Sequence, residues 1–314
     1  MFEPSKTLVI ANPMARHGFV GDNWPTLSAQ ILEALGPVDL QLTKSQGDGL
    51  RIGKQAIAEG ARTIISFGGD GTHSEVVDAI MRSGLNEEVT LGILHAGTGG
   101  DFRRMIPGAE ELQSGCAVIR NERAIPIDIG WVQYVDDEGR SEGRFFLNIT
   151  SLGMGGLVDR LVAASPSKSS GKAKYFKAVL RAQMKYKPAR IRLRIDGKDE
   201  GEHAISNICV CNGRWAGGGM MFAPEARVAD GVFDVVLIRA TSTLRGLPVM
   251  AALYKGTHVR SPIVSTYRGR HVTVEILANT AWMDIDGEAP GVGPAEFRIH
   301  DHALRVIGIG PEFI

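Results

Sequence analysis

The chain has 314 residues, which exceeds the size at which a single hydrophobic core usually stops growing, so two domains are expected. Lysine plus arginine and aspartate plus glutamate number 35 each, and this zero formal net charge argues against a general nucleic-acid-binding protein. Neither a signal-peptide pattern nor an unbroken apolar run of about 18 residues occurs. We therefore expect a cytoplasmic protein whose membrane contact, if it has any, is transient and peripheral.

The three cysteines are too few and too unevenly placed for a disulfide framework. Cys209 and Cys211 would point to one face of a strand, but a lone pair of this spacing is a poor metal site. We interpret all three as reduced core residues.

The N-terminal part of the chain alternates short β runs with helices. Short strands separated by helices of this size predict a parallel sheet covered on both faces, with ligands at the carboxyl ends of its strands. The predicted strands are 8–11, 38–42, 63–67 and 90–94, and the predicted helices are 24–35, 50–59 and 73–81.

A glycine-rich loop follows the third of these strands. The strand 63–67 runs into three glycines, Asp70 and Thr72, just before a predicted helix. Glycine lets a backbone approach a ligand closely, and the start of a helix favours an anion, so the loop predicts phosphate binding. It lacks the lysine of the common P-loop, and a carboxylate beside phosphates would need a cation between them, which indicates a metal nucleotide. The alternative is that the loop is only a turn.

Two further predicted strands end in loops of similar chemistry. Asn12-Pro13 follows the first strand, and the residues 97–101, Gly-Thr-Gly-Gly-Asp, follow the fourth. The carboxyl ends of parallel strands lie along one edge of a sheet, so these loops and 68–72 should surround one ligand.

From about Ala124 the pattern becomes β-rich. Alternating strands with few helices predict a C-terminal antiparallel β-sandwich, and we expect the active site in a cleft between the two domains, 1–123 and 124–314. The predicted strands are 125–130, 144–150, 189–195, 205–211, 232–238, 271–277, 281–285 and 303–309.

A basic segment interrupts this half, because no acidic residue occurs between Arg160 and Asp196. A helical arrangement would place Phe176, Val179, Leu180 and Met184 on one face and Lys174, Lys177, Arg181 and Lys185 on another. Such a helix suits an anionic membrane surface, and residues 168–194 are the predicted contact. The alternative is an ordinary half-buried helix with a solvated charged face.

With these residues in hand, the chain resembles the diacylglycerol kinase catalytic-domain family, in particular the soluble bacterial diacylglycerol and lipid kinases, with sphingosine and ceramide kinases as distant relatives. The motif Gly68–Thr72 alone also occurs in NAD kinases, whereas an ordered set ending in Asp-Gly-Glu is much more specific. That set comprises Asn12-Pro13, Thr43, Gly68–Thr72 with Glu75, Gly97–Asp101, Ile127–Gly130, Asn148–Gly153, Asn212-Gly213, Gly217–Gly219, Pro224, Ala226, Asp230-Gly231, Asp234 and Asp286–Glu288.

The resemblance implies a Rossmann-like N-terminal domain that binds ATP, a β-sandwich that binds the lipid, and roles for particular residues. Asp70, Asp101 and Asp128 would surround the catalytic Mg²⁺, partly through water, Glu288 would be the general base, and Asp230 would hold a second Mg²⁺. A carboxylate acts as a base when its surroundings raise its pKa towards neutrality. The implied nucleotide-binding residues are Asn12, Thr43, Gly68, Gly69, Gly71, Thr72, Glu75, Gly97, Thr98 and Gly99.

Structural alternatives exist for several of these residues. Asp128 could be a strand-end residue satisfied by backbone, Asp286-Gly287 a hairpin turn, and Asp101 the N-cap of a short helix. The chain also departs from the family at Gly100, where asparagine is usual, in Lys44–Gly49, where relatives carry a His-Ala pair, and at Arg16–Gly18.

The expected activity is therefore transfer of the γ-phosphate of ATP to a lipid hydroxyl, on diacylglycerol or a related lipid, with a place in phospholipid metabolism. The alternatives are a kinase of a soluble alcohol or nucleotide, and a catalytically weak regulator that binds nucleotide and lipid. The acceptor and the oligomeric state, a homodimer included, are left open.

Overall fold

The computed structural model describes residues 2–96, 100–165 and 171–314, and these form two compact units. The N-terminal unit holds residues 1–129, 227–230 and 300–314, and the C-terminal unit holds 130–226 and 231–299. The predicted division at residue 124 therefore differs from the observed one in position. It also omits the return of two later segments to the N-terminal unit.

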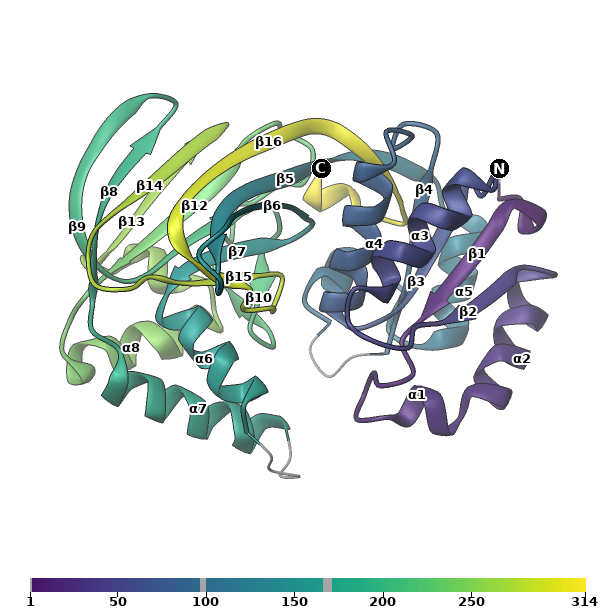
Figure 1. The fold of residues 1–314 in the computed structure, drawn as a ribbon, viewed down its shortest axis with the longest axis horizontal. Coiled ribbons are helices and arrows are strands. Elements are labelled where there is room, and N and C mark those ends of the chain that lie inside the picture. Colours follow the sequence, from purple (N-terminus) through teal and green to yellow (C-terminus); the bar gives the residue numbers. More distant parts are fainter. Residues whose placement is uncertain (1, 97–99, 166–170) are drawn as a thin grey trace. The chain divides into compact units, whose positions relative to one another are not determined.

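The N-terminal unit is a parallel sheet with helices on both faces (Figure 1). Strands β2, β1, β3 and β4 are neighbours in that order, and the end of β16 pairs in parallel with β4. The strands are β1 Thr7–Ala11, β2 Asp39–Leu42, β3 Thr63–Gly68 and β4 Thr90–His95. The helices are α1 Phe19–Asp22, α2 Trp24–Leu35, α3 Asp48–Ala58, α4 Asp70–Arg82 and α5 Leu112–Asn121, with the 3₁₀-helices η1 Pro4–Lys6, η2 Phe102–Met105 and η4 Pro311–Phe313.

Both faces of this sheet are buried, as the near-continuous apolar runs of its strands require. Val9 belongs to the core shared with α2 and α5. Ile10 points the other way, to α3, where its Cδ1 lies 3.7 Å from the position that a Cβ on Gly53 would take. The expected parallel sheet with helical layers is confirmed.

The C-terminal unit is built on antiparallel strands. Strands β13, β12, β9, β7 and β15 are neighbours in that order, β8 joins β9 to β14, and β5 pairs with β6. The strands are β5 Ala124–Asp136, β6 Ser141–Phe146, β7 Ile149–Gly153, β8 Ala189–Ile195, β9 Lys198–Cys211, β10 Trp215–Ala216, β11 Met220–Met221, β12 Phe233–Arg239, β13 Val264–Gly269, β14 His271–Ala278, β15 Trp282–Ile285 and β16 Gly291–Ile307. The helices are α6 Met154–Ala163, α7 Gly171–Lys185 and α8 Thr243–Leu253, with the 3₁₀-helix η3 Thr257–Arg260.

Alternate residues of β12 enter two different cores. Val235 and Leu237 join the core in which the Phe146 ring stacks on Phe233 at 5.7 Å between centroids. Val236 faces the second core, which it shares with α8 and with the side chains of Cys209 and Cys211. These two cysteines and Cys116 are free and buried, as predicted. Burial raises the pKa of the Cys116 thiol to about 11.

Two predictions for this half are corrected. The expected strand 144–150 is two strands, β6 and β7, because the chain turns where Leu147 N and Asn148 N donate to Asp286. Helix α8 was not expected, since Gly246 and Pro248 within it weaken a helical pattern. No helix among the described residues has the length and apolar content needed to cross a bilayer.

Candidate active site

The ends of β1, β2 and β3 bring the first predicted loops to one edge of the sheet. In the parallel register Ala11 lies between Leu42 and Phe67. Asn12 N then donates to Phe67 O at 2.9 Å, and Thr43 N donates to Ala11 O at 2.9 Å. The structure thus brings Asn12, Thr43 and the glycine loop together, as the strand pattern predicts.

A side-chain hydrogen bond ties the first loop to the third. Asn12 Nδ2 donates to Thr72 Oγ1 at 3.1 Å, and Asn12 Oδ1 accepts from Met14 N at 2.9 Å, which orients the amide. Gly68 is needed here, because a Cβ on it would lie 2.5 Å from Thr72 Oγ1. Helix α4 begins at Asp70, directly after Gly69, and the first turn of a helix presents backbone N–H groups that favour an anion. This arrangement is suited to a phosphate.

Glu75 fixes the loop that follows Thr43. Its Oε1 accepts from Gly47 N at 2.7 Å and its Oε2 from Gly49 N at 2.9 Å. A Cβ on Gly49 would lie 2.7 Å from Glu75 Oε2, so the carboxylate occupies that space. The segment Lys44–Gly49, which departs from the pattern of the family that the sequence resembles, is therefore anchored by a residue predicted to bind nucleotide.

The fourth loop is described only from its end. Gly97, Thr98 and Gly99, all predicted to bind nucleotide, lie outside the described residues. Gly100 has φ +63°, and a Cβ on it would lie 2.6 Å from His95 Nε2. The His95 imidazole thus lies where a side chain at position 100 would begin.

Buried carboxylates follow in the same unit. Asp101 is buried, occupies the N-cap position of η2 without a capping hydrogen bond from its side chain, and lies 3.5 Å from Arg104 Nε. Asp128 of β5 is fully buried, and its Oδ1 accepts from His302 N at 2.8 Å. Asp101 thus lies at a helix N-cap position and Asp128 accepts a backbone hydrogen bond, as the two structural alternatives proposed. Neither arrangement excludes metal binding.

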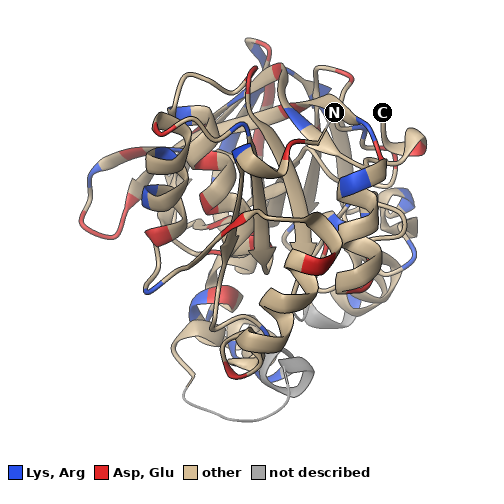
Figure 2. Ribbon diagram, turned by 90° about the vertical axis from the view of Figure 1, so that its right-hand side faces the viewer, with Lys and Arg blue, Asp and Glu red and all other residues tan. Residues whose placement is uncertain are grey.

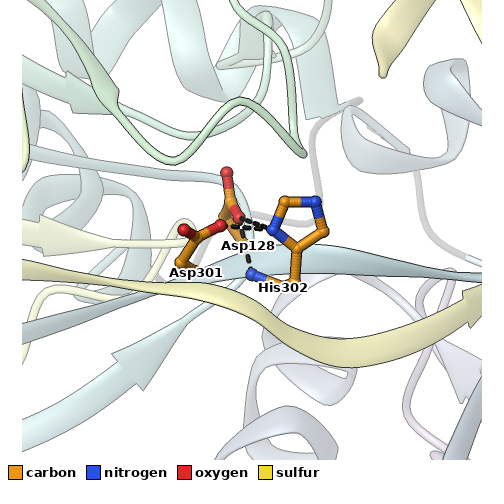
Figure 3. Close-up of side chains that lie close together, drawn as sticks. All are labelled: Asp128, Asp301 and His302. Atoms are coloured by element: carbon orange, nitrogen blue, oxygen red, sulfur yellow. Dashed lines mark hydrogen bonds and ion pairs between the residues drawn. The ribbon is translucent and has the colours of Figure 1, made fainter.

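One group of candidate metal ligands forms among the described residues (Figure 3). Asp128, Asp301 and His302 offer ligand atoms that all lie within 4.8 Å of one another, and His302 Nδ1 also contacts Asp301 Oδ1. Asp70 and Asp101 are not members of this group, so their common Mg²⁺ site with Asp128 stays a prediction.

Sequence reasoning missed Asp301 and His302. They lie in β16, 173 residues or more from Asp128, and only the return of residues 300–314 to the N-terminal unit brings them close. One feature of the sequence could have pointed to them: the polar run His300–His302 interrupts an otherwise strand-like segment. Carboxylate oxygens and water suit Mg²⁺, so Asp70, Asp101 and Asp128 fit that ion, whereas the His302 imidazole suits transition metals better.

The C-terminal unit carries the predicted base on a tight turn. Asp286 and Gly287 both have positive φ, 49° and 87°, and Ile285 exchanges backbone hydrogen bonds with Glu288 across them. The hairpin-turn alternative is therefore correct in geometry, and it projects Glu288 from the end of the turn. The half-buried Glu288 accepts from Arg144 Nη1 at 2.6 Å through Oε2, a partner that the sequence did not indicate.

A half-buried pair of acidic residues, Asp284 and Asp159, supports the same turn. Asp284 Oδ1 accepts from Gly287 N at 2.8 Å, and its Oδ2 faces Ser151 Oγ at 3.4 Å. Burial, and then the charge of Asp159, raises the pKa of Asp284 far above its usual range. Burial also raises the pKa of Asp159, to about 7. Both pKa shifts favour the protonated over the charged carboxyl.

Asp230, the predicted ligand of a second Mg²⁺, is exposed in a segment that belongs to the N-terminal unit. It is not a member of the group around Asp128, so this ligand role stays a prediction.

Comparisons with known proteins agree with this geometry. Residues 6–132 match the diacylglycerol kinase catalytic domain, and residues 148–308 match the YegS C-terminal NAD kinase beta sandwich-like domain. A "Diacylglycerol kinase" of Bacillus subtilis is 29% identical over 261 residues, which cover 81% of this chain and 80% of that protein. A "Probable lipid kinase YegS-like" of Pseudomonas aeruginosa is 32% identical over 276 residues, which cover 87% of this chain and 85% of that protein.

Solved structures show the same fold. A diacylglycerol kinase from Bacillus anthracis superimposes with a TM-score of 0.69 at 20% identity over 98% of each chain. Yeast NADH kinase gives a TM-score of 0.51 at 12% identity over 97% of this chain and 83% of its own. Both structural likenesses concern the fold alone. Together with the two domain matches and the curated relatives, they show that this chain belongs to the diacylglycerol kinase catalytic-domain family and is a lipid kinase of that family.

Proposed function

We propose that this kinase transfers the γ-phosphoryl group of ATP to the hydroxyl of diacylglycerol or a related membrane lipid, with Mg²⁺ as its metal. The observation that carries the proposal is the hydrogen bond from Asn12 to Thr72, which joins two loops at the strand ends beside the start of α4. The names of the curated relatives, diacylglycerol kinase and lipid kinase, support the class of acceptor.

In this proposal the phosphates of ATP lie against the glycine loop and the first turn of α4. Asn12, Thr43 and Thr72 orient them, and Glu75 holds the neighbouring backbone in place. Asp70, Asp101 and Asp128 would hold Mg²⁺, and the bound ion would neutralise negative charge on the phosphates. Phosphoryl transfer depends mainly on such positioning, so a rigid set of loops is what the reaction requires.

The acceptor side of the reaction is assigned to Glu288. The lipid hydroxyl oxygen forms a bond to the γ-phosphorus, the bond from that phosphorus to the β-phosphate oxygen breaks, and the hydroxyl proton passes to the Glu288 carboxylate. Arg144 fixes Oε2 of this carboxylate, and the backbone at residues 285–288 fixes its chain position. Residues 168–194 are the proposed contact with the anionic membrane that contains the lipid.

The test is a phosphorylation assay with γ-labelled ATP and dispersed diacylglycerol, monoacylglycerol, ceramide, sphingosine or phosphatidylglycerol, with and without EDTA. We expect label in one lipid, its loss with EDTA, and a decrease of at least about 100-fold in kcat for Glu288→Gln. Asp137→Asn, an exposed carboxylate of the same unit, serves as a control and should keep full activity. Nucleotide binding without label in any lipid would overturn the proposal and favour a regulator or a soluble acceptor.

A further inference from the structure

Large apolar side chains are exposed at one end of the C-terminal unit. Among the described residues of that unit the exposed ones belong to α7, to α8 with the residue that follows it, and to the end of β14. They are Leu180, Met184, Leu247, Tyr254 and Leu277. Met184 is 79% exposed and Tyr254 is 59% exposed.

Helix α7 turns its small residues inward and its large ones outward. Ala178 and Ala182 are buried against Val158 of α6, while Leu180 and Met184 are exposed. Of the predicted apolar face, Val179 is half-buried against this core, whereas Leu180 and Met184 are exposed, so the prediction is only partly correct. Phe176 and Lys174, also assigned to its faces, lie among residues whose side chains are not described.

The exposed face of α7 mixes apolar and cationic side chains. Lys177, Leu180, Arg181, Met184 and Lys185 are all exposed, and their spacing of three and four places them on one face. Between Arg160 and Asp196 the chain has no carboxylate to neutralise them.

Helix α8 repeats this arrangement. Val249 and Leu253 are buried in the core behind it, while Leu247 and Tyr254 are exposed on the opposite side. Arg245 and Lys255 are exposed near its two ends, and no acidic residue occurs between Asp234 and Glu275.

Strand β9 holds the facing ends of the two helices next to each other. Tyr186, just after α7, donates from its hydroxyl to Ile205 O at 3.2 Å, and Ala240, just before α8, donates from its N–H to Ala204 O at 2.8 Å. The end of β14 joins them, because Asn279 Nδ2 donates to Pro188 O at 2.9 Å. In Figure 1 both helices lie below the strands of their unit.

The cations of these helices differ from those of the neighbouring strand β8. On β8, Arg190 and Arg192 pair with Glu202, and Figure 2 shows both signs of charge interspersed on the elements turned to the viewer. Lys177, Arg181 and Arg245 make no ion pair among the described residues. A face with unneutralised cations and projecting apolar side chains complements acidic headgroups above a hydrocarbon layer.

We propose that α7 and α8, with Leu277, form one docking surface for an anionic lipid bilayer. The proposal rests on the proposed function, which requires an acceptor that resides in a membrane. It extends the predicted contact at 168–194 to a second helix some sixty residues further along the chain. Leu180, Met184, Leu247 and Tyr254 enter the interface, and the cations meet the headgroups.

The test is co-sedimentation of the full chain, without ATP, with phosphatidylcholine vesicles that contain or lack phosphatidylglycerol. We expect binding only with the anionic lipid and weaker binding in high salt. Lys177→Glu/Arg181→Glu and Arg245→Glu/Lys255→Glu should each reduce the partition coefficient about tenfold or more. Leu180→Ser/Leu247→Ser should reduce it about tenfold as well, because the apolar contribution is lost.

Lys54→Glu/Arg123→Glu is the matched control, since both cations are exposed but belong to the N-terminal unit. All substituted side chains are exposed, so thermal unfolding should be unchanged. Equal binding to both vesicle types, an effect of the α7 pair without one of the α8 pair, or an equal loss in the control would overturn the proposal. Activity on detergent-dispersed lipid with no vesicle binding would overturn docking alone, whereas docking without activity on any lipid would overturn the proposed function alone.

Discussion

Gly100 shows how a single residue accounts for a departure from the family. Its φ of +63° is tolerated by asparagine, so backbone geometry alone does not require glycine. The lack of space favours glycine, because a Cβ at this position would lie 2.6 Å from His95 Nε2. The sequence showed that the usual asparagine is missing, but it gave no sign that a histidine five residues earlier occupies its place.

We therefore expect the effects of substitutions at positions 95 and 100 to be coupled. Gly100→Asn should lower the free energy of unfolding by about 1–2 kcal/mol, and in the His95→Ala background most of this cost should disappear, a coupling of about 1 kcal/mol. Urea denaturation of the wild type, the two single variants and the double variant measures this coupling free energy. Gly84→Asn is the matched control, since Gly84 has φ +71° and no atom within 4 Å of the position of an added Cβ. Additive effects of the two substitutions would show that the His95 ring moves aside at little cost in free energy.

At the scale of elements, the sequence predicted strands β1 to β4 and helices α2, α3 and α4 of the N-terminal unit, but not α1 or α5. Helix 24–35 has the observed bounds of α2, and the alternation of strand and helix gave the parallel sheet and its loop-bearing edge. It failed where long-range contacts decide the outcome. The division of 144–150 into β6 and β7 depends on Asp286, and local propensity carries no information about a residue that distant.

The turn between β15 and Glu288 gives a prediction at this scale. The buried Asp286 carboxylate accepts from the backbone N–H groups of Leu147, Asn148 and Ile149 at 2.8–3.0 Å. Asp286→Asn puts an amide donor against one of these donors and should lower the free energy of unfolding by about 2–4 kcal/mol. Because Glu288 lies two residues further on, kcat should also fall while KM for ATP stays unchanged.

Denaturation by urea and steady-state kinetics measure these two effects. The same change at exposed Asp199, which accepts one backbone N–H from Gly201, is the control and should cost no more than about 0.5 kcal/mol. A loss at Asp286 no larger than this would mean that the three hydrogen bonds do not hold the turn.

At the scale of the whole molecule, the order of motifs along the sequence identified the family. The same motifs did not predict the group of candidate metal ligands around Asp128. Asp128 was predicted from the sequence, but Asp301 and His302 reach it only because the last segment of the chain returns to the N-terminal unit. The sequence also did not predict that Leu180 and Met184 are exposed. A helical pattern shows which residues share a face, but it does not show which face is buried.

Acid stability is a property of the whole chain to which one buried group contributes strongly. Burial, and then the nearby His95, lowers the pKa of His73 to about 3, while its Nδ1 bonds Ser66 Oγ at 2.7 Å. The unfolded chain takes up this proton first as pH falls below about 6.5, so stability is present at neutral pH and is lost towards pH 3. The loss from this residue between pH 7 and pH 5 should be about 2 kcal/mol.

His73→Asn should remove this pH dependence. Urea unfolding at both pH values isolates the effect, because any constant cost of the substitution cancels within each protein. We expect the variant to lose about 2 kcal/mol less than the wild type between pH 7 and pH 5, and His17→Asn, which removes an exposed imidazole, to behave as the wild type does. Equal losses in wild type and His73→Asn would mean that His73 takes up a proton in the folded protein near its usual pKa, so that the core around Ser66 admits the charge.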